Sequence, residues 1–225
     1  LMGRVFLHPR LNLLMSIPFR NNYRAEGEYQ VADVYGIGDP QTILNYRLIN
    51  SVKTDSSEFI HRLTISGGLK WKVGKTDVQL DGQLLDHDLQ LGSGSWDVLA
   101  GLEYYGMFKS CGVYGALGTA QKLGESRLDL GNRYLADVGL LAMLNVRKFR
   151  VVPFVAYRSE IYKKDHVNLD QSVSAEVVHL LRTNLGIYRG KCSLNVNYNY
   201  PLYQETRESS LKYGQTFALG VTYFI

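Results

Sequence analysis

The sequence predicts an all-β protein, a transmembrane antiparallel up-and-down β-barrel of about 12 strands, formed by residues 1–225 as a single domain. Apolar side chains recur at every second position in one segment after another, which is the period of a β-strand. Long polar connections alternate with tight turns along the whole chain, as in barrels with long outer loops and short periplasmic turns. The longest apolar runs, such as residues 138–146, are far shorter than the ~18 to 20 residues of a spanning helix.

The last stretch, residues 213–225, shows the alternation that predicts a strand in contact with lipid. Phe217, Leu219 and Val221 fall on one face, and the positions between them carry small or polar side chains. Residues 59–71 alternate most cleanly, with Leu63, Ile65, Leu69 and Trp71 on one face and Arg62, Thr64, Ser66, Gly68 and Lys70 on the other. A soluble sandwich would bury such a polar row at a high cost, whereas a membrane barrel turns it inward.

The expected strands follow one another with a regular change of connection length. They are residues 3–7, 11–20, 41–50, 59–71, 95–107, 110–121, 132–146, 149–160, 172–188, 191–200 and 213–225. Long polar loops are expected at residues 21–40, 73–94, 122–131, 161–171 and 201–212. Because bacterial barrels have an even number of strands, one more strand is expected before residue 1. No signal peptide is visible, so we expect a processed or incomplete chain.

Composition excludes several classes of protein. Charged residues make up 20% and hydrophobic residues 45% of the chain, which is ordinary for a folded protein. The net charge of +4 forms no basic stripe, and no aromatic and basic module of a nucleic-acid binder is present, so nucleic acid is not an expected partner. The two cysteines, Cys111 and Cys192, are expected to be free thiols.

The row opposite the apolar one supplies the candidate lining of the barrel. These residues are Asp39, Arg47, Arg62, Lys70, Asp97, Glu103, Asp137, Arg158, Arg182, Asn195 and Asn197, with Glu176 as a further candidate. Asp39, Asp97 and Asp137 are expected near the outer ends of three descending strands. Two interpretations stay open: a polar network that fills and stiffens the barrel, and a solute path whose selectivity is set by the charges.

Three other sequence patterns are explained better by structural roles than by catalysis or by the binding of a phosphate or a metal ion. Gly36, Gly38, Gly92 and Gly94 precede strands, whereas a phosphate-binding loop precedes a helix, so turn or bulge positions are expected there. The adjacent Asp86, His87 and Asp88 rarely converge on one ion, so no metal site is expected. The scattered histidines have no nucleophile beside them, and neither an enzyme activity nor a cofactor is expected.

Aromatic side chains are expected to form interfacial girdles, where a ring has its apolar body in lipid and its polar edge in water. The residues assigned to these girdles are Tyr23, Tyr46, Trp71, Trp96, Tyr104, Tyr105, Tyr157, Tyr188, Tyr198 and Tyr223.

Short segments in the right order resemble an outer-membrane family, the meta-pathway phenol-degradation transporters. They are residues 14–19 (LMSIPF), 36–39 (GIGD), 44–48 (LNYRL), 91–97 (LGSGSWD) and 200–204 (YPLYQ). The resemblance implies an outer-membrane barrel of a Gram-negative envelope with a role in moving small hydrophobic compounds, and it carries over no catalytic residues. The expected partners are outer-membrane lipid, lipopolysaccharide and a small hydrophobic solute, together with other outer-membrane proteins.

Three functions remain as hypotheses from the sequence. The first is a passive outer-membrane channel or uptake porin for small solutes. The second is a plugged structural or accessory barrel within a larger envelope assembly. The third is a soluble ligand-binding barrel, against which the inward rows of Arg62, Lys70 and Asn199 count, since a soluble barrel has its polar face outside.

Overall fold

The computed structural model describes residues 1–26, 29–51, 59–80, 82–85, 89–124, 131–163, 176–205 and 214–223. The regular structure in these ranges is all-β and is dominated by one large antiparallel sheet. Its strands are β1 (Met2–His8), β2 (Leu11–Ser16), β5 (Gln41–Asn50), β6 (Phe59–Lys70), β9 (Trp96–Phe108), β10 (Cys111–Leu123), β11 (Arg133–Ala142), β12 (Leu144–Val146), β13 (Phe149–Tyr162), β14 (Glu176–Arg189), β15 (Cys192–Glu205) and β16 (Thr216–Tyr223).

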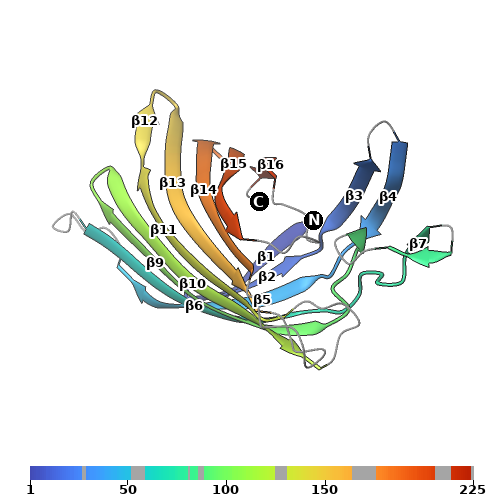
Figure 1. The fold of residues 1–225 in the computed structure, drawn as a ribbon. Coiled ribbons are helices and arrows are strands. Elements are labelled where there is room, and N and C mark those ends of the chain that lie inside the picture. The colour runs from blue at the N-terminus through green and yellow to red at the C-terminus, as the bar shows by residue number, and fades with distance from the viewer. Residues whose placement is uncertain are drawn as a thin grey trace.

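The strands pair in an up-and-down order. The hydrogen-bonded path is β1-β2-β5-β6-β9-β10-β11-β13-β14-β15-β16, and β12 pairs with β13. Since β11 and β12 both lie along β13 and only Met143 separates them, they form one interrupted strand. The sheet therefore has the eleven strand positions that the sequence predicts, and it bends into a deep trough (Figure 1).

The trough is open along one side. Among the described residues, β1 pairs only with β2 and β16 pairs only with β15. The two edges carry backbone groups that a closed cylinder would pair.

Three tight turns lie close to where they are predicted. Lys109 between β9 and β10, Arg147 between β12 and β13, and Gly190 between β14 and β15 have φ values of 51°, 55° and 56°. Left-handed turn residues match the right-handed twist of the strands that they connect, so these hairpins keep a regular register.

Two predicted polar loops contain strands. Residues 21–40 were expected to be a loop, but β3 (Phe19–Glu26) and β4 (Tyr29–Ile37) form a hairpin there (Figure 1). The two strands were not predicted because the hairpin is separate from the large sheet and its polar sequence has no continuous apolar row. Within residues 73–94, β7 (Gln79–Leu80) and β8 (Gln83–Leu84) form a minimal hairpin.

The two faces of the large sheet differ sharply in polarity. The exposed side chains of its central and last strands include Leu102, Val113, Leu117, Val138, Leu140, Phe217, Leu219 and Val221, which are 41% to 76% exposed. The buried polar side chains include Asn12, Asp137, Glu160 and Ser193, all at 5% exposure or below. This is the reverse of a water-soluble protein, whose apolar row lies inside.

Candidate functional site

The strand registers place most predicted lining residues on one face of the sheet. Asp97 is the cross-strand partner of Lys70, and Asp137 is the partner of Arg158. Directly paired residues point to the same side of a sheet. The same register assigns to this face Arg47, Arg62, Lys70, Asp97, Glu103, Asp137, Arg158, Glu176, Arg182, Asn195 and Asn197. We call this side the inner face, because side chains from non-neighbouring strands converge on it.

Asp137 in β11 is the centre of the strongest ion-pair cluster. Arg158 in β13 donates from Nε at 3.1 and 3.0 Å to Oδ1 and Oδ2, and from Nη2 at 2.6 Å to Oδ2. Arg182 in β14 donates from Nη1 to the same Oδ2 at 2.9 Å. The Asp137 side chain is 1% exposed, so the two guanidinium groups compensate a charge that would be costly alone.

Glu160 in β13 extends the cluster and was not among the predicted residues. It accepts hydrogen bonds from Arg133 Nη2 at 2.8 Å, Arg158 Nη1 at 3.3 Å and the Tyr162 hydroxyl at 2.5 Å. The signal in the sequence is its position two residues after Arg158, which puts both side chains on one face of a strand. We define Arg133, Asp137, Arg158, Glu160 and Arg182 as the inner charge cluster.

A second ion pair joins β6 and β9, which precede the strands of the inner charge cluster in the chain. Lys70 Nζ in β6 binds the carboxylate of Asp97 in β9, and both side chains are largely buried, at 15% and 13% exposure. The Ser95 hydroxyl donates to Asp97 Oδ1 at 2.7 Å. Asp97 thus lies near the long-loop end of β9, on the inner face.

Asp39 departs from its predicted role. It lies just before β5 and is 5% exposed, and its carboxylate accepts four hydrogen bonds from the segment after β6. The donors are Val73 N at 3.1 Å, Gly74 N at 2.9 Å, Ser93 N at 2.6 Å and Ser93 Oγ at 2.7 Å. Burial raises the pKa of Asp39, but the hydrogen bonds from Ser93, Gly74 and Val73 outweigh burial and hold the pKa below its ordinary 3.8. Asp39 therefore anchors a loop.

The anchored segment is packed tightly around Gly74 and Gly92, of which Gly92 was predicted to be a turn or bulge position. A Cβ added at Gly92 would lie 2.3 Å from the carbonyl oxygen of Gly74, so only glycine fits at this crossing. The side chain of Gln90 is 1% exposed and binds the backbone of Val78 and Leu85. The loop is thus a folded element held by polar contacts.

Amides occupy the inner face of the last strands. Asn184 Nδ2 donates to Asn197 Oδ1 at 2.7 Å, and Asn195 Nδ2 donates to Ser193 Oγ at 3.3 Å. This sector of the wall is polar and uncharged.

A cavity of about 620 Å³ lies on the inner face. Its lining across β5 to β11 is small and apolar, with Ile43, Leu99, Gly101, Gly118, Ala120 and Leu135. Charged side chains also line the cavity, namely Arg20, Lys70, Asp97, Arg133 and Glu176. Ser93 is a further polar residue of the lining. The cavity therefore offers an apolar surface within a charged wall.

The aromatic girdle prediction needs correction at two positions. Tyr105 is the cross-strand partner of Arg62, and Tyr188 is the partner of Ser193, so both lie on the inner face. Their positions near strand ends suggested an interface, but their alternation places them with the polar row. Trp71 and Trp96 do lie on the outer face, with ring centroids 5.1 Å apart. The side chain of Tyr23 lies outside the described residues.

Other candidates from the sequence give no cluster. Asp86, His87 and Asp88 lie outside the described residues, and within the described ranges no three His, Cys, Asp or Glu side chains are placed to hold a metal ion. Cys111 and Cys192 are free and exposed. No helix in the described part of the chain is long and apolar enough to cross a membrane.

No protein-family model matches the chain, and no curated protein matches it significantly.

Proposed function

We propose that this protein is an outer-membrane β-barrel that acts as a passive channel or uptake porin for small solutes, hydrophobic ones included. The observation that carries the proposal is the reversed polarity of the sheet. Val138 and Leu117 are 62% and 60% exposed in mid-strand, whereas Asp137 is buried. A lipid bilayer removes the cost of exposing the first two, and a lumen accounts for the inward row.

The proposal requires closure of the trough. A sheet edge in hydrocarbon leaves backbone N–H and C=O groups without partners, at several kcal/mol for each group. We therefore propose that β1 and β16 are joined in the membrane, directly or through a further strand, to give a cylinder of about 12 strands.

The volume and the lining of the cavity on the inner face support a lumen that admits small solutes. The cavity volume of about 620 Å³ lies within the roughly 300 to 1,000 Å³ of small-molecule sites. An apolar body can lie along Leu99 and Leu135 while water and polar groups contact Lys70 and Asp97. Diffusion through such a lumen needs neither a cofactor nor a covalent step. The transport role implied by the resemblance of residues 14–19 and 91–97 to the phenol-degradation transporters belongs to this proposal.

A plugged structural barrel is the second candidate. The inner charge cluster favours it, because Arg182 reaches over β13 to Asp137 and stiffens the wall. The folded loop anchored by Asp39 also favours it. A plugged barrel would serve as a subunit of a larger assembly with other outer-membrane proteins.

Solute flux distinguishes the two candidates. The full chain is reconstituted into liposomes that contain lipopolysaccharide, and swelling is measured with small sugars and with small organic ions of either charge. We expect flux through the wild-type protein and a changed rate or charge preference in Asp97→Ala, because Lys70 then faces the lumen unpaired. Leu117→Ala on the outer face is the control and should conduct as the wild type does. Liposomes that stay sealed with every variant would contradict the channel and favour the plugged barrel.

A further inference from the structure

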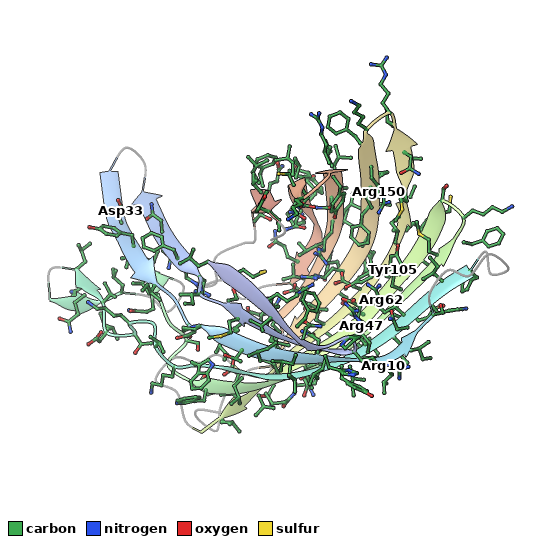
Figure 2. All side chains as sticks on the ribbon, turned by 180° about the vertical axis from the view of Figure 1, so that it is seen from behind. Arg10, Asp33, Arg47, Arg62, Tyr105 and Arg150 are labelled. Carbon is green, nitrogen blue, oxygen red and sulfur yellow. The ribbon has the colours of Figure 1, made fainter. Side chains whose placement is uncertain are left out.

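Three arginines gather on the inner face at one side of the trough. Arg4 lies in β1, Arg47 in β5 and Arg62 in β6, and their registers place all three with the polar row. Arg47 lies within the electrostatic field of the charges of both Arg62 and Arg4. Figure 2 shows Arg47 and Arg62 together with Tyr105, the cross-strand partner of Arg62. We call Arg4, Arg47 and Arg62 the arginine trio.

The partners of the trio are neutral. Arg47 Nη1 donates to the carbonyl oxygen of Pro9 at 3.2 Å, and Arg62 Nε donates to Asn50 Oδ1 at 3.4 Å. No carboxylate of the described residues forms an ion pair with the trio, whereas each arginine of the inner charge cluster has one. Among the described residues, the trio is therefore a positive region without an ion-pair partner, whereas the arginines of the inner charge cluster are paired.

A cluster of like charges that have no ion-pair partner favours the binding of an anion. Like charges repel over several ångströms, and the low dielectric of a barrel wall weakens the screening. A guanidinium group presents a planar fork of donors that fits carboxylate and phosphate oxygens. The Tyr105 hydroxyl adds a donor beside Arg62, because its contact is Met107 Sδ at 3.2 Å, a weak acceptor.

We propose that the arginine trio is an anion site in the lumen, and that it makes the channel selective for small anions with carboxylate or phosphate oxygens. The selectivity rests on the proposed channel function, whereas the binding of an anion does not. The guanidinium groups of the trio attract the anion, and the site is separate from the cavity of the inner face, which none of the three arginines lines.

Ion selectivity tests the proposal in planar bilayers. The reversal potential is measured across a potassium chloride gradient and then with potassium acetate. We expect the wild type to prefer the anion, and the double variant R47Q/R62Q to lose about two- to fivefold in the anion-to-cation permeability ratio for each charge removed. The control is Arg189→Gln, since Arg189 lies over the Phe149 ring at a turn. A wild type that prefers potassium, or an unchanged ratio in the double variant, would overturn the proposal.

A binding measurement tests the anion site even if the barrel is sealed. The thermal unfolding midpoint of the detergent-solubilised protein is followed against inorganic phosphate at constant ionic strength. We expect the midpoint to rise for the wild type and Arg189→Gln, and to rise less for R47Q/R62Q. Equal responses of all three proteins would refute the anion site, and a sealed barrel with the expected response would refute the channel alone. Far-UV circular dichroism checks that the double variant is folded.

Discussion

Arg182 in β14 binds Asp137 in β11 across the intervening strand β13, with 2.9 Å between Nη1 and Oδ2. The contact links two strands that do not pair with each other. It therefore ties β11, β13 and β14 together through one buried carboxylate, which Arg158 also binds.

Asp137→Asn is expected to destabilise the protein by about 2 to 3 kcal/mol, because it leaves two guanidinium groups of the inner face without their common anion. The value is below that of a fully buried pair because Arg158 and Arg182 remain 21% and 26% exposed. Urea titration in detergent micelles measures the change. Asp33→Asn is the matched control, since Asp33 is an exposed carboxylate of the β3–β4 hairpin (Figure 2) and should cost less than about 0.5 kcal/mol. Equal losses in the two variants would contradict this role of Asp137.

Acid is expected to release the loop that Asp39 holds. The pKa of Asp39 is lowered in the folded protein relative to 3.8 in the unfolded chain. Its contribution to stability is therefore complete above about pH 4 and is lost as the pH falls through the lower folded pKa. The protection factors of the Gly74 and Ser93 amides, which compare their exchange rates with those of the unfolded chain at the same pH, should fall over that range. In Asp39→Asn the exchange should be fast already at pH 7, and a slow exchange there would contradict the anchor.

A charge on the outer face is expected to be far more costly than one on the inner face. Leu117 lies in the middle of β10 and is 60% exposed. Leu117→Arg should destabilise the protein in lipid vesicles by about 2 to 4 kcal/mol, as arginine does at the midplane of a bilayer. Ala218→Arg, on the inner face of β16 opposite Asn197, is the comparison and should cost less. A loss below about 0.5 kcal/mol for Leu117→Arg would match a position in water and not in lipid.

The alternation along the strands was predictable because it has a single geometric cause. Successive side chains of a strand point to opposite faces. Once a strand is recognised, the face of the sheet on which Lys70, Asp97 or Arg158 lies is therefore known. The number of strand positions and the tight turns were predictable for the same reason. The closure of a barrel was predicted as well, but the described sheet remains open between β1 and β16.

Features that depend on contacts across the trough could not be predicted. The pairing of Arg182 with Asp137 depends on the strand order and register around β13, which the local sequence does not encode. The anchoring role of Asp39 depends on a loop that returns from residues 73–93. The break at Met143 interrupts a strand whose apolar pattern continues on both sides, and nothing in the structure explains it.

The most direct test of the membrane barrel is the solvent around two neighbouring positions of β10. Cys111 and Cys192 are first replaced by serine, since both are free and exposed. A nitroxide label is then placed at Ala116 or Leu117 in reconstituted protein, and its spin relaxation is measured with oxygen, which enriches in lipid, and with a water-soluble nickel chelate. We expect oxygen to dominate at Leu117 and the chelate to dominate at Ala116. If the chelate reaches Leu117 as readily as Ala116, the outer face is in water and the protein does not span a membrane.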